Sequence, residues 1–126
     1  MKFLLDTHIL LWWLNDDEKL SEAARQLISN ADNDIYISHI SLWEIQIKTM
    51  VGKLNANLTD ILQQLPENSF QQLPTHANHI LALASLPAHH HDPFDRMLIA
   101  QAISEPLHLM THDKQVALYS GSIILI

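Results

Sequence analysis

Short apolar segments alternate with helical segments along this chain, and this alternation restricts its fold more than any other feature. The segments expected to be strands are residues 1–5, 34–38, 69–74, 107–110 and 122–126. The segments expected to be helices are residues 7–14, 21–30, 39–51, 58–65, 75–86, 92–104 and 113–119. Strands that are apolar throughout are typical of a parallel sheet with helices on both faces. We therefore predict an α/β fold with a mainly parallel sheet.

Glycine and proline mark several of the expected helix ends. Gly52 suits the C-terminal stop of the helix that begins near residue 39. Pro66, Pro87 and Pro106 are expected to end the helices that precede them, because proline disrupts a helix interior. The chain has only two glycines, which excludes a glycine-rich phosphate-binding loop.

Composition and charge limit the classes of protein to which the chain can belong. Its 126 residues, 48% of them hydrophobic, are enough for one domain with one core. A formal net charge of −7 is the wrong sign for a broad basic face that grips nucleic acid, so a bound cation would have to supply positive charge. The absence of cysteine excludes thiolate metal sites. The apolar runs are too short to cross a bilayer, and Asp6 interrupts the first of them.

Four carboxylates are expected at one edge of the sheet. Asp6 directly follows the first strand, and Asp113 follows the strand at 107–110 closely. Asp95 lies in the first turn of the helix that leads into that strand, and Glu44 lies near the start of another helix. Parallel strands all end at one edge, and the connecting helices begin there. The four acids therefore face the edge at which open α/β sheets bind ligands.

Each aspartate also has a purely structural explanation as part of a helix start. Asp6 and Asp113 can each cap the helix that follows. Asp92 followed by Pro93 fits the N-cap and first helical positions. That register places Asp95 at the third helical position, where a carboxylate is favourable. For a single aspartate, capping is the more common role.

Glu44 is harder to explain by helix capping. Residues 41–44, Ser-Leu-Trp-Glu, match a capping box. The spacing of the apolar residues instead suggests that the helix begins nearer Ser38, which puts Glu44 on an apolar face with Ile47. A carboxylate on such a face needs an ion partner or a bound cation. Lys48, four residues later, is the competing partner.

A divalent cation would relieve the repulsion within such a group of acids. Carboxylates that share a site raise one another's pKa values unless a cation is bound. Oxygen ligands in a chain without cysteine favour Mg²⁺ or Mn²⁺ over zinc. A site of this kind suits phosphodiester hydrolysis, in which the metal activates water and stabilises charge on the phosphate.

Four segments of the sequence resemble the PIN-domain ribonucleases, and most closely the VapC-type toxins of bacterial toxin–antitoxin pairs. They are, in this order, FLLDTHILLWWL, ISLWEIQIKTMVGKL, HHHDPFDRMLIAQA and MTHDKQV, and the similarity extends over nearly the whole chain. The resemblance implies a three-layer α/β/α sandwich and a single PIN domain over residues 1–126. It also implies a metal-dependent endoribonuclease that uses Mg²⁺ or Mn²⁺.

The resemblance carries expectations about site residues and partners as well. The acidic residues that match the catalytic, metal-binding set of the family are Asp6, Glu44, Asp95 and Asp113. Thr7 and Thr111 match the hydroxyl residues that orient these acids. The expected partners are an RNA substrate, a cognate antitoxin and a second copy of the chain in a cytoplasmic homodimer.

Asp92 departs from the family pattern by adding a carboxylate before Asp95. We interpret it as a helix cap, with a role as a metal ligand as the alternative.

The histidines and basic residues carry weaker signals. The tract at residues 89–91 is expected to be a solvated loop that meets RNA phosphate, and adjacent histidines make a poor zinc site. Lys48, Arg96 and Lys114 each lie within four residues of a candidate ligand. They form either local ion pairs or a small cationic rim that holds phosphate.

The first expected helix is apolar on every side over residues 9–14. Packing on a sheet needs only one apolar stripe, which leaves Leu11 and Trp12 pointing elsewhere. These side chains are either buried by a neighbouring helix or exposed as a binding patch. The resemblance suggests an antitoxin helix on that patch, with Trp12 as its anchor.

Two other functions compete with a ribonuclease toxin. The first is a catalytically inactive PIN-like module that acts through protein partners, and the presence of all four acids disfavours it. The second is a nuclease of DNA flaps, which the short chain disfavours because such enzymes carry additional arches.

Overall fold

The computed structural model describes residues 1–89 and 92–126. Its strands are β1 (Lys2–Leu5), β2 (Asp34–Ser38), β3 (Gln71–Leu73), β4 (His108–Thr111) and β5 (Ile124–Leu125). Its helices are α1 (Thr7–Leu14), α2 (Glu22–Ser29), α3 (His39–Met50), α4 (Leu58–Glu67), α5 (Ala77–Ala82), the 3₁₀ helix η1 (Leu83–Ser85), α6 (Pro93–Ser104) and α7 (Lys114–Ala117). None of these helices combines the length and apolar character needed to cross a membrane.

The strands form one parallel sheet in the order β3-β2-β1-β4-β5. From β1 the chain first adds strands on one side and later crosses to the other, so the switch in strand order lies between β1 and β4. The carboxyl ends of these two central strands therefore border the position at which open α/β sheets bind ligands. The predicted α/β fold with a parallel sheet is confirmed.

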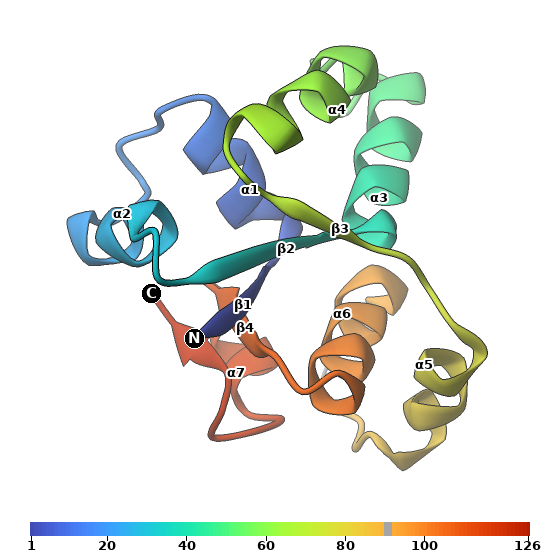
Figure 1. The fold of residues 1–126 in the computed structure, drawn as a ribbon. Coiled ribbons are helices and arrows are strands. Elements are labelled where there is room, and N and C mark those ends of the chain that lie inside the picture. Colours follow the sequence, from blue (N-terminus) through green and yellow to red (C-terminus); the bar gives the residue numbers. More distant parts are fainter. Residues whose placement is uncertain (90–91) are drawn as a thin grey trace.

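Helices cover both faces of the sheet, as Figure 1 shows, with α1, α2 and α4 on one face and α6 on the other, while α5 packs against α6. The alternation along β1 explains why two cores form. Phe3 and Leu5 pack into the core under α1, α2 and α4, while Leu4 between them packs into the core with α6 and α7. Helix α3 contributes to both cores, through Ile45 and Ile40 respectively. The three-layer sandwich is confirmed.

Most helix ends lie close to the positions predicted from glycine and proline. Gly52 follows α3 with a φ of 78°, the left-handed conformation expected just beyond a helix end. The prediction that Pro66 ends its helix is wrong, since α4 continues to Glu67. Pro66 lies in the last turn, where its missing N–H costs only one helical hydrogen bond. The predicted helix at 75–86 is divided into α5 and the 3₁₀ helix η1.

Candidate active site

Asp6 lies between β1 and α1 and is only 6% exposed. Its Oδ1 accepts a hydrogen bond of 2.9 Å from the backbone N–H of Ile9, so it caps α1 as predicted. Its Oδ2 accepts a hydrogen bond of 2.6 Å from the hydroxyl of Thr111 at the end of the neighbouring strand β4. Capping and site formation are therefore compatible, because each carboxylate oxygen has a different partner.

The environment of Asp6 opposes its ionisation. Burial raises the pKa of this carboxyl above its ordinary value, and the negative charge of Glu44 raises it further. The hydrogen bonds from Thr111 and Ile9 and the charge of His8 lower the pKa, but burial outweighs them. A cation near Asp6 would therefore stabilise the ionised carboxylate strongly.

Asp113 is joined to Asp6 through the same threonine. Thr111 Oγ1 accepts a hydrogen bond of 3.0 Å from the backbone N–H of Asp113 while its proton is donated to Asp6. Asp113 caps α7, with Oδ1 accepting from the N–H of Gln115 at 2.8 Å. Thr111 thus fixes both the side chain of Asp6 and the backbone of Asp113.

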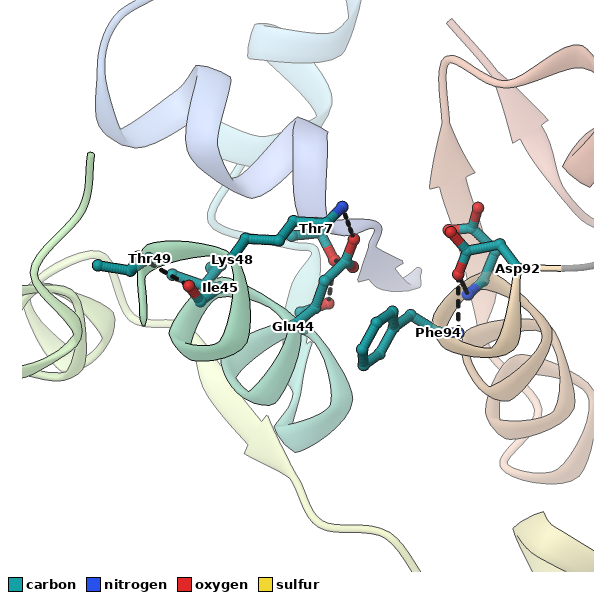
Figure 2. A network of polar contacts seen from close by, with 9 residues as sticks. Thr7, Glu44, Ile45, Lys48, Thr49, Asp92 and Phe94 are labelled. Atoms are coloured by element: carbon teal, nitrogen blue, oxygen red, sulfur yellow. Dashed lines mark hydrogen bonds and ion pairs between the residues drawn. The ribbon is translucent and has the colours of Figure 1, made fainter. Parts of the chain in front are cut away.

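Glu44 is buried on α3, with 3% of the residue exposed. Its Oε1 accepts a hydrogen bond of 2.6 Å from the hydroxyl of Thr7, which follows Asp6 directly. Its Oε2 forms an ion pair with Lys48, the partner that the sequence offered as an alternative (Figure 2). The charges of Glu44 and Asp6 also interact, so the two carboxylates belong to one electrostatic group.

The start of α3 agrees with the register inferred from apolar spacing. Ser38 is the N-cap, and its Oγ accepts a hydrogen bond of 2.9 Å from the N–H of Ile40. Ser41 is therefore inside the helix, where it is fully buried and lies 3.1 Å from Thr7 Oγ1. The capping-box explanation of Glu44 therefore does not apply, because Ser38 and not Ser41 is the N-cap of α3.

Asp92 is the N-cap of α6 and Asp95 lies in its first turn. Figure 2 shows Asp92 across from Glu44 of α3. Asp92 Oδ1 accepts from the N–H groups of Phe94 and Asp95 at 2.8 and 3.2 Å, so Asp92 is the predicted cap. Both acids act on Lys48 through their charges. Partial burial lowers the pKa of Lys48, but the hydrogen bond to Glu44 and the charges of Glu44, Asp92 and Asp95 raise it overall.

A hollow of about 320 Å³ opens beside the two aspartates at the ends of β1 and β4. It is lined by Asp6, His8, Trp12, His112 and Asp113. The Trp12 ring packs against the rings of His112 and His8, with centroids 5.3 and 6.3 Å apart. His112 Nδ1 lies 2.5 Å from the carbonyl oxygen of Ile126, which orients the imidazole. The lining of the hollow therefore combines the carboxylates of Asp6 and Asp113 with the rings of Trp12, His8 and His112.

Sequence reasoning did not assign His8, Trp12 or His112 to the site. A signal was present, because His8 and His112 each lie within two residues of a predicted acid. Trp12 is one turn beyond His8 on α1, so helical spacing places both on the same face. Like Leu11, Trp12 is half-buried against the core, so neither forms a fully exposed patch.

The donor atoms fit a hard divalent cation in chemistry, although their arrangement is not closed around one. Carboxylate oxygens from Asp6, Glu44, Asp95 and Asp113 are the ligands that Mg²⁺ and Mn²⁺ prefer. In the described ranges, 1–89 and 92–126, no three His, Asp or Glu side chains form a group that could hold a metal. The positive charge next to Glu44 is the ammonium of Lys48.

The basic residues differ in their roles. Arg96 donates to the carbonyl of Pro87 at 3.0 Å and to the hydroxyl of Tyr119 at 3.2 Å, so it links Pro87 to the residues just after α7. Lys114 is exposed at the start of α7. His89 contacts the Tyr119 ring at 5.1 Å, and the other two histidines of the tract, His90 and His91, lie outside the described residues.

Comparison with known proteins places the chain in a family. A model of the PIN domain matches residues 3–121, and the chain therefore belongs to the PIN-domain family. It is 32% identical to Ribonuclease VapC22 of Mycobacterium tuberculosis over an alignment of 118 residues, and the alignment covers 90% of this chain and 88% of the relative. The resemblance inferred from the four sequence segments is confirmed.

Solved structures share the fold over the whole chain. VapBC2 from Rickettsia felis, bound to a DNA fragment from its promoter, gives a TM-score of 0.74 at 20% identity, covering 100% of this chain and 98% of that chain. VapBC-1 from nontypeable Haemophilus influenzae gives 0.66 at 19% identity, covering 100% and 97%. Identities this low support the fold alone.

Proposed function

We propose that this chain is a ribonuclease toxin that hydrolyses RNA phosphodiester bonds and is inhibited by a cognate antitoxin. The observation that carries this proposal is a pair of threonine hydroxyls that hold acids near the carboxyl ends of β1 and β4. Thr111 donates to Asp6 and accepts from the N–H of Asp113, and Thr7, the residue after Asp6, donates to Glu44 of α3. The relative in Mycobacterium tuberculosis is a ribonuclease by name, which supports the same activity. Residues 1–126 act as one PIN domain in this proposal.

The proposed metal ligands are Asp6, Glu44, Asp95 and Asp113, and the proposed ion is Mg²⁺ or Mn²⁺. When bound, such an ion would activate water and stabilise charge on the scissile phosphate. The chain itself supplies orientation: Thr111 fixes the Asp6 carboxylate, and Thr7 fixes that of Glu44. Both hydroxyls donate at 2.6 Å, so both favour the ionised forms that bind cations.

Cleavage assays distinguish this proposal from an inactive binding module. The purified chain is incubated with single-stranded and structured RNAs in Mg²⁺, Mn²⁺ or EDTA, and the cleavage ends are mapped. We expect cuts that require metal and that disappear in Asp6→Asn purified in parallel. Asp32→Asn is the matched control and should cut normally, because this exposed acid precedes β2 and so lies at the amino edge of the sheet, opposite the site. Activity that survives in Asp6→Asn would identify a contaminating nuclease.

We infer that the antitoxin binds on α1 and α4. Leu11, Leu14, Leu54 and Ile61 border a hollow of about 200 Å³ between these helices, and polar side chains surround it. An apolar side chain on an antitoxin helix would fill this hollow. Leu11→Ser should preserve RNA cleavage but weaken inhibition in a titration with the cognate antitoxin. Equal inhibition of variant and wild type would place the antitoxin elsewhere.

A homodimer in the cytoplasm completes the proposal. Exposed apolar side chains lie on α3 and α5, namely Trp43, Met50, Ile80 and Leu81. Large apolar side chains with this exposure are candidates for burial against a second copy of the chain. Light scattering after gel filtration should give twice the chain mass, and Leu81→Glu should give a monomer.

A further inference from the structure

Glu44 and Lys48 form an ion pair in which the two partners are buried to very different extents. The Glu44 side chain is 4% exposed, whereas that of Lys48 is 36% exposed. The residues are one turn apart on α3, so the ammonium reaches the carboxylate without help from another element (Figure 2). The contact is built into the helix and does not depend on the approach of a partner.

The pair occupies one oxygen of a carboxylate whose other oxygen is already used. Thr7 donates to Glu44 Oε1 at 2.6 Å, and Lys48 holds Oε2. A buried carboxylate needs a cation or several donors, and here one hydroxyl and one ammonium meet that need. A divalent cation that approaches Oε2 meets the positive charge of the ammonium there, so the two cations repel each other and compete for this oxygen.

The surroundings of Lys48 favour a cation at this position. The negative charges of Asp92 and Asp95 add to that of Glu44 and hold Lys48 in its charged form. Asp92 is the N-cap of α6 and Asp95 lies in its first turn, so this attraction reaches Lys48 on α3 from a second helix. The same field would attract a metal ion, and the two cations therefore compete for one place.

We propose that Lys48 is a positioning residue that holds Glu44 in place when no metal is bound and competes with a divalent cation for that carboxylate. The inference rests on the proposed metal site, and it does not require that RNA be the substrate. Metal affinity is then set by a competition inside the chain, and removal of the ammonium makes the site bind metal more tightly. A purely structural ion pair predicts the opposite, because loss of Lys48 would disorder Glu44 and weaken binding.

The test measures Mn²⁺ binding to the full chain by calorimetry in the absence of RNA. Lys48→Met removes the charge and keeps most of the apolar stem. We expect its Kd for Mn²⁺ to be about tenfold lower than that of the wild type, which is a typical size for the coupling between two groups that compete for a site. Lys53→Met is the matched control, because Lys53 is exposed just beyond the same helix, and its Kd should equal that of the wild type. An unchanged or higher Kd in Lys48→Met would overturn the proposal.

A stability measurement decides the matter if Lys48→Met folds poorly without metal. Loss of the ammonium leaves Glu44 buried without a cation, so the melting temperature in EDTA should fall. Added Mn²⁺ should then raise it by more than it raises that of the wild type. Adding Glu44→Gln to Lys48→Met should abolish this extra gain, and a gain that persists in the double variant would overturn the proposal.

The outcome is separable from the nuclease assay. Tighter Mn²⁺ binding in Lys48→Met together with no cleavage of any RNA would support the competition and refute the ribonuclease. Normal RNA cleavage together with an unchanged Kd in Lys48→Met would support the ribonuclease and refute the competition between Lys48 and the metal.

Discussion

The hydroxyl of Thr111 donates a 2.6 Å hydrogen bond to Oδ2 of Asp6, across 105 positions of sequence. The two residues lie at the ends of β4 and β1, the strands on either side of the switch in strand order. A buried acid in this position would otherwise have one oxygen without a partner, because its other oxygen caps α1. The pairing of β1 with β4 therefore brings the Thr111 hydroxyl to the Asp6 carboxylate, where it stabilises the negative charge.

Thr111→Val tests this link with a side chain of nearly the same shape. We expect the free energy of unfolding to fall by about 1–3 kcal/mol, because Oδ2 of buried Asp6 and the N–H of Asp113 both lose a partner. RNA cleavage should fall at least roughly tenfold, since the orientation of an acid is lost. Urea unfolding and single-turnover cleavage measure the two effects. Thr59→Val, an exposed threonine on α4, should change neither.

Asp6→Asn should make the stability of the chain less dependent on pH. The folded-state pKa of Asp6 is raised above its ordinary value of 3.8, chiefly by burial, so the folded chain binds its proton more tightly than the unfolded chain does. Asp6 therefore favours folding below the ordinary pKa, and this contribution is lost as pH rises through the folded-state pKa. At neutral pH the asparagine variant should be the more stable protein.

Urea unfolding at pH values of about 7 and about 4 measures this effect. The stability advantage of Asp6→Asn over the wild type should be largest at the higher pH and should shrink as the pH falls. Asp32→Asn, at an exposed acid, controls for the substitution itself. An advantage for Asp6→Asn that grew toward acid pH would contradict the assignment.

Asp92 and Asp95 should respond differently to the same substitution. Asparagine caps helices as well as aspartate does, so Asp92→Asn should keep its hydrogen bonds to the first turn of α6 and retain RNA cleavage. Asp95→Asn should fold normally but lose cleavage by roughly a hundredfold or more, because an amide is a poor cation ligand. Circular dichroism and a cleavage time course separate folding from activity. Loss of Mn²⁺ binding in Asp92→Asn would make Asp92 a ligand.

The sequence contains most of the local information about this fold. Apolar runs predicted the strands, and helix-start chemistry predicted the caps at Asp6, Asp92 and Asp113. The start of α3 at Ser38 followed from apolar spacing, because a helix that packs on a sheet must keep one apolar side toward it. These features depend on residues a few positions apart, which is why sequence patterns detect them.

Contacts between distant segments could not be predicted in this way. His79 is fully buried, and its Nε2 lies 2.5 Å from Glu105 Oε2, while its Nδ1 accepts from the N–H of His76 at 3.0 Å. Gln101 lies fully buried beside it and contacts Ser38 Oγ at 2.5 Å. Nothing in the local sequence distinguishes these side chains from exposed ones. Their partners are set by how α5 and α6 pack, which is a tertiary property.

Arg96 illustrates the same difficulty at a predicted functional residue. Its proximity to Asp95 suggested a cationic rim, but its guanidinium donates to the carbonyl of Pro87 and the hydroxyl of Tyr119. Arg96→Ala should therefore lower the free energy of unfolding by about 1–2 kcal/mol, because hydrogen bonds across two segments are lost. RNA affinity should fall less than in Lys114→Ala, whose ammonium is exposed beside Asp113. A larger loss of RNA affinity in Arg96→Ala than in Lys114→Ala would support the hypothesis that Arg96 belongs to a cationic rim that holds phosphate.

Trp12 provides the last prediction, because its ring lies on the wall of the hollow that holds Asp6 and Asp113. An aromatic surface beside a phosphodiester site can stack an unpaired base, and such stacking is worth about 1–3 kcal/mol. Trp12→Ala should therefore weaken the binding of single-stranded RNA about tenfold, whereas Trp12→Phe should retain most of it. Fluorescence anisotropy in an Asp95→Asn background measures affinity without cleavage. Double-stranded RNA should show a smaller change, because its bases are already stacked. Equal affinity of Trp12→Ala and the parent for single-stranded RNA would leave the indole with a packing role against His8 and His112.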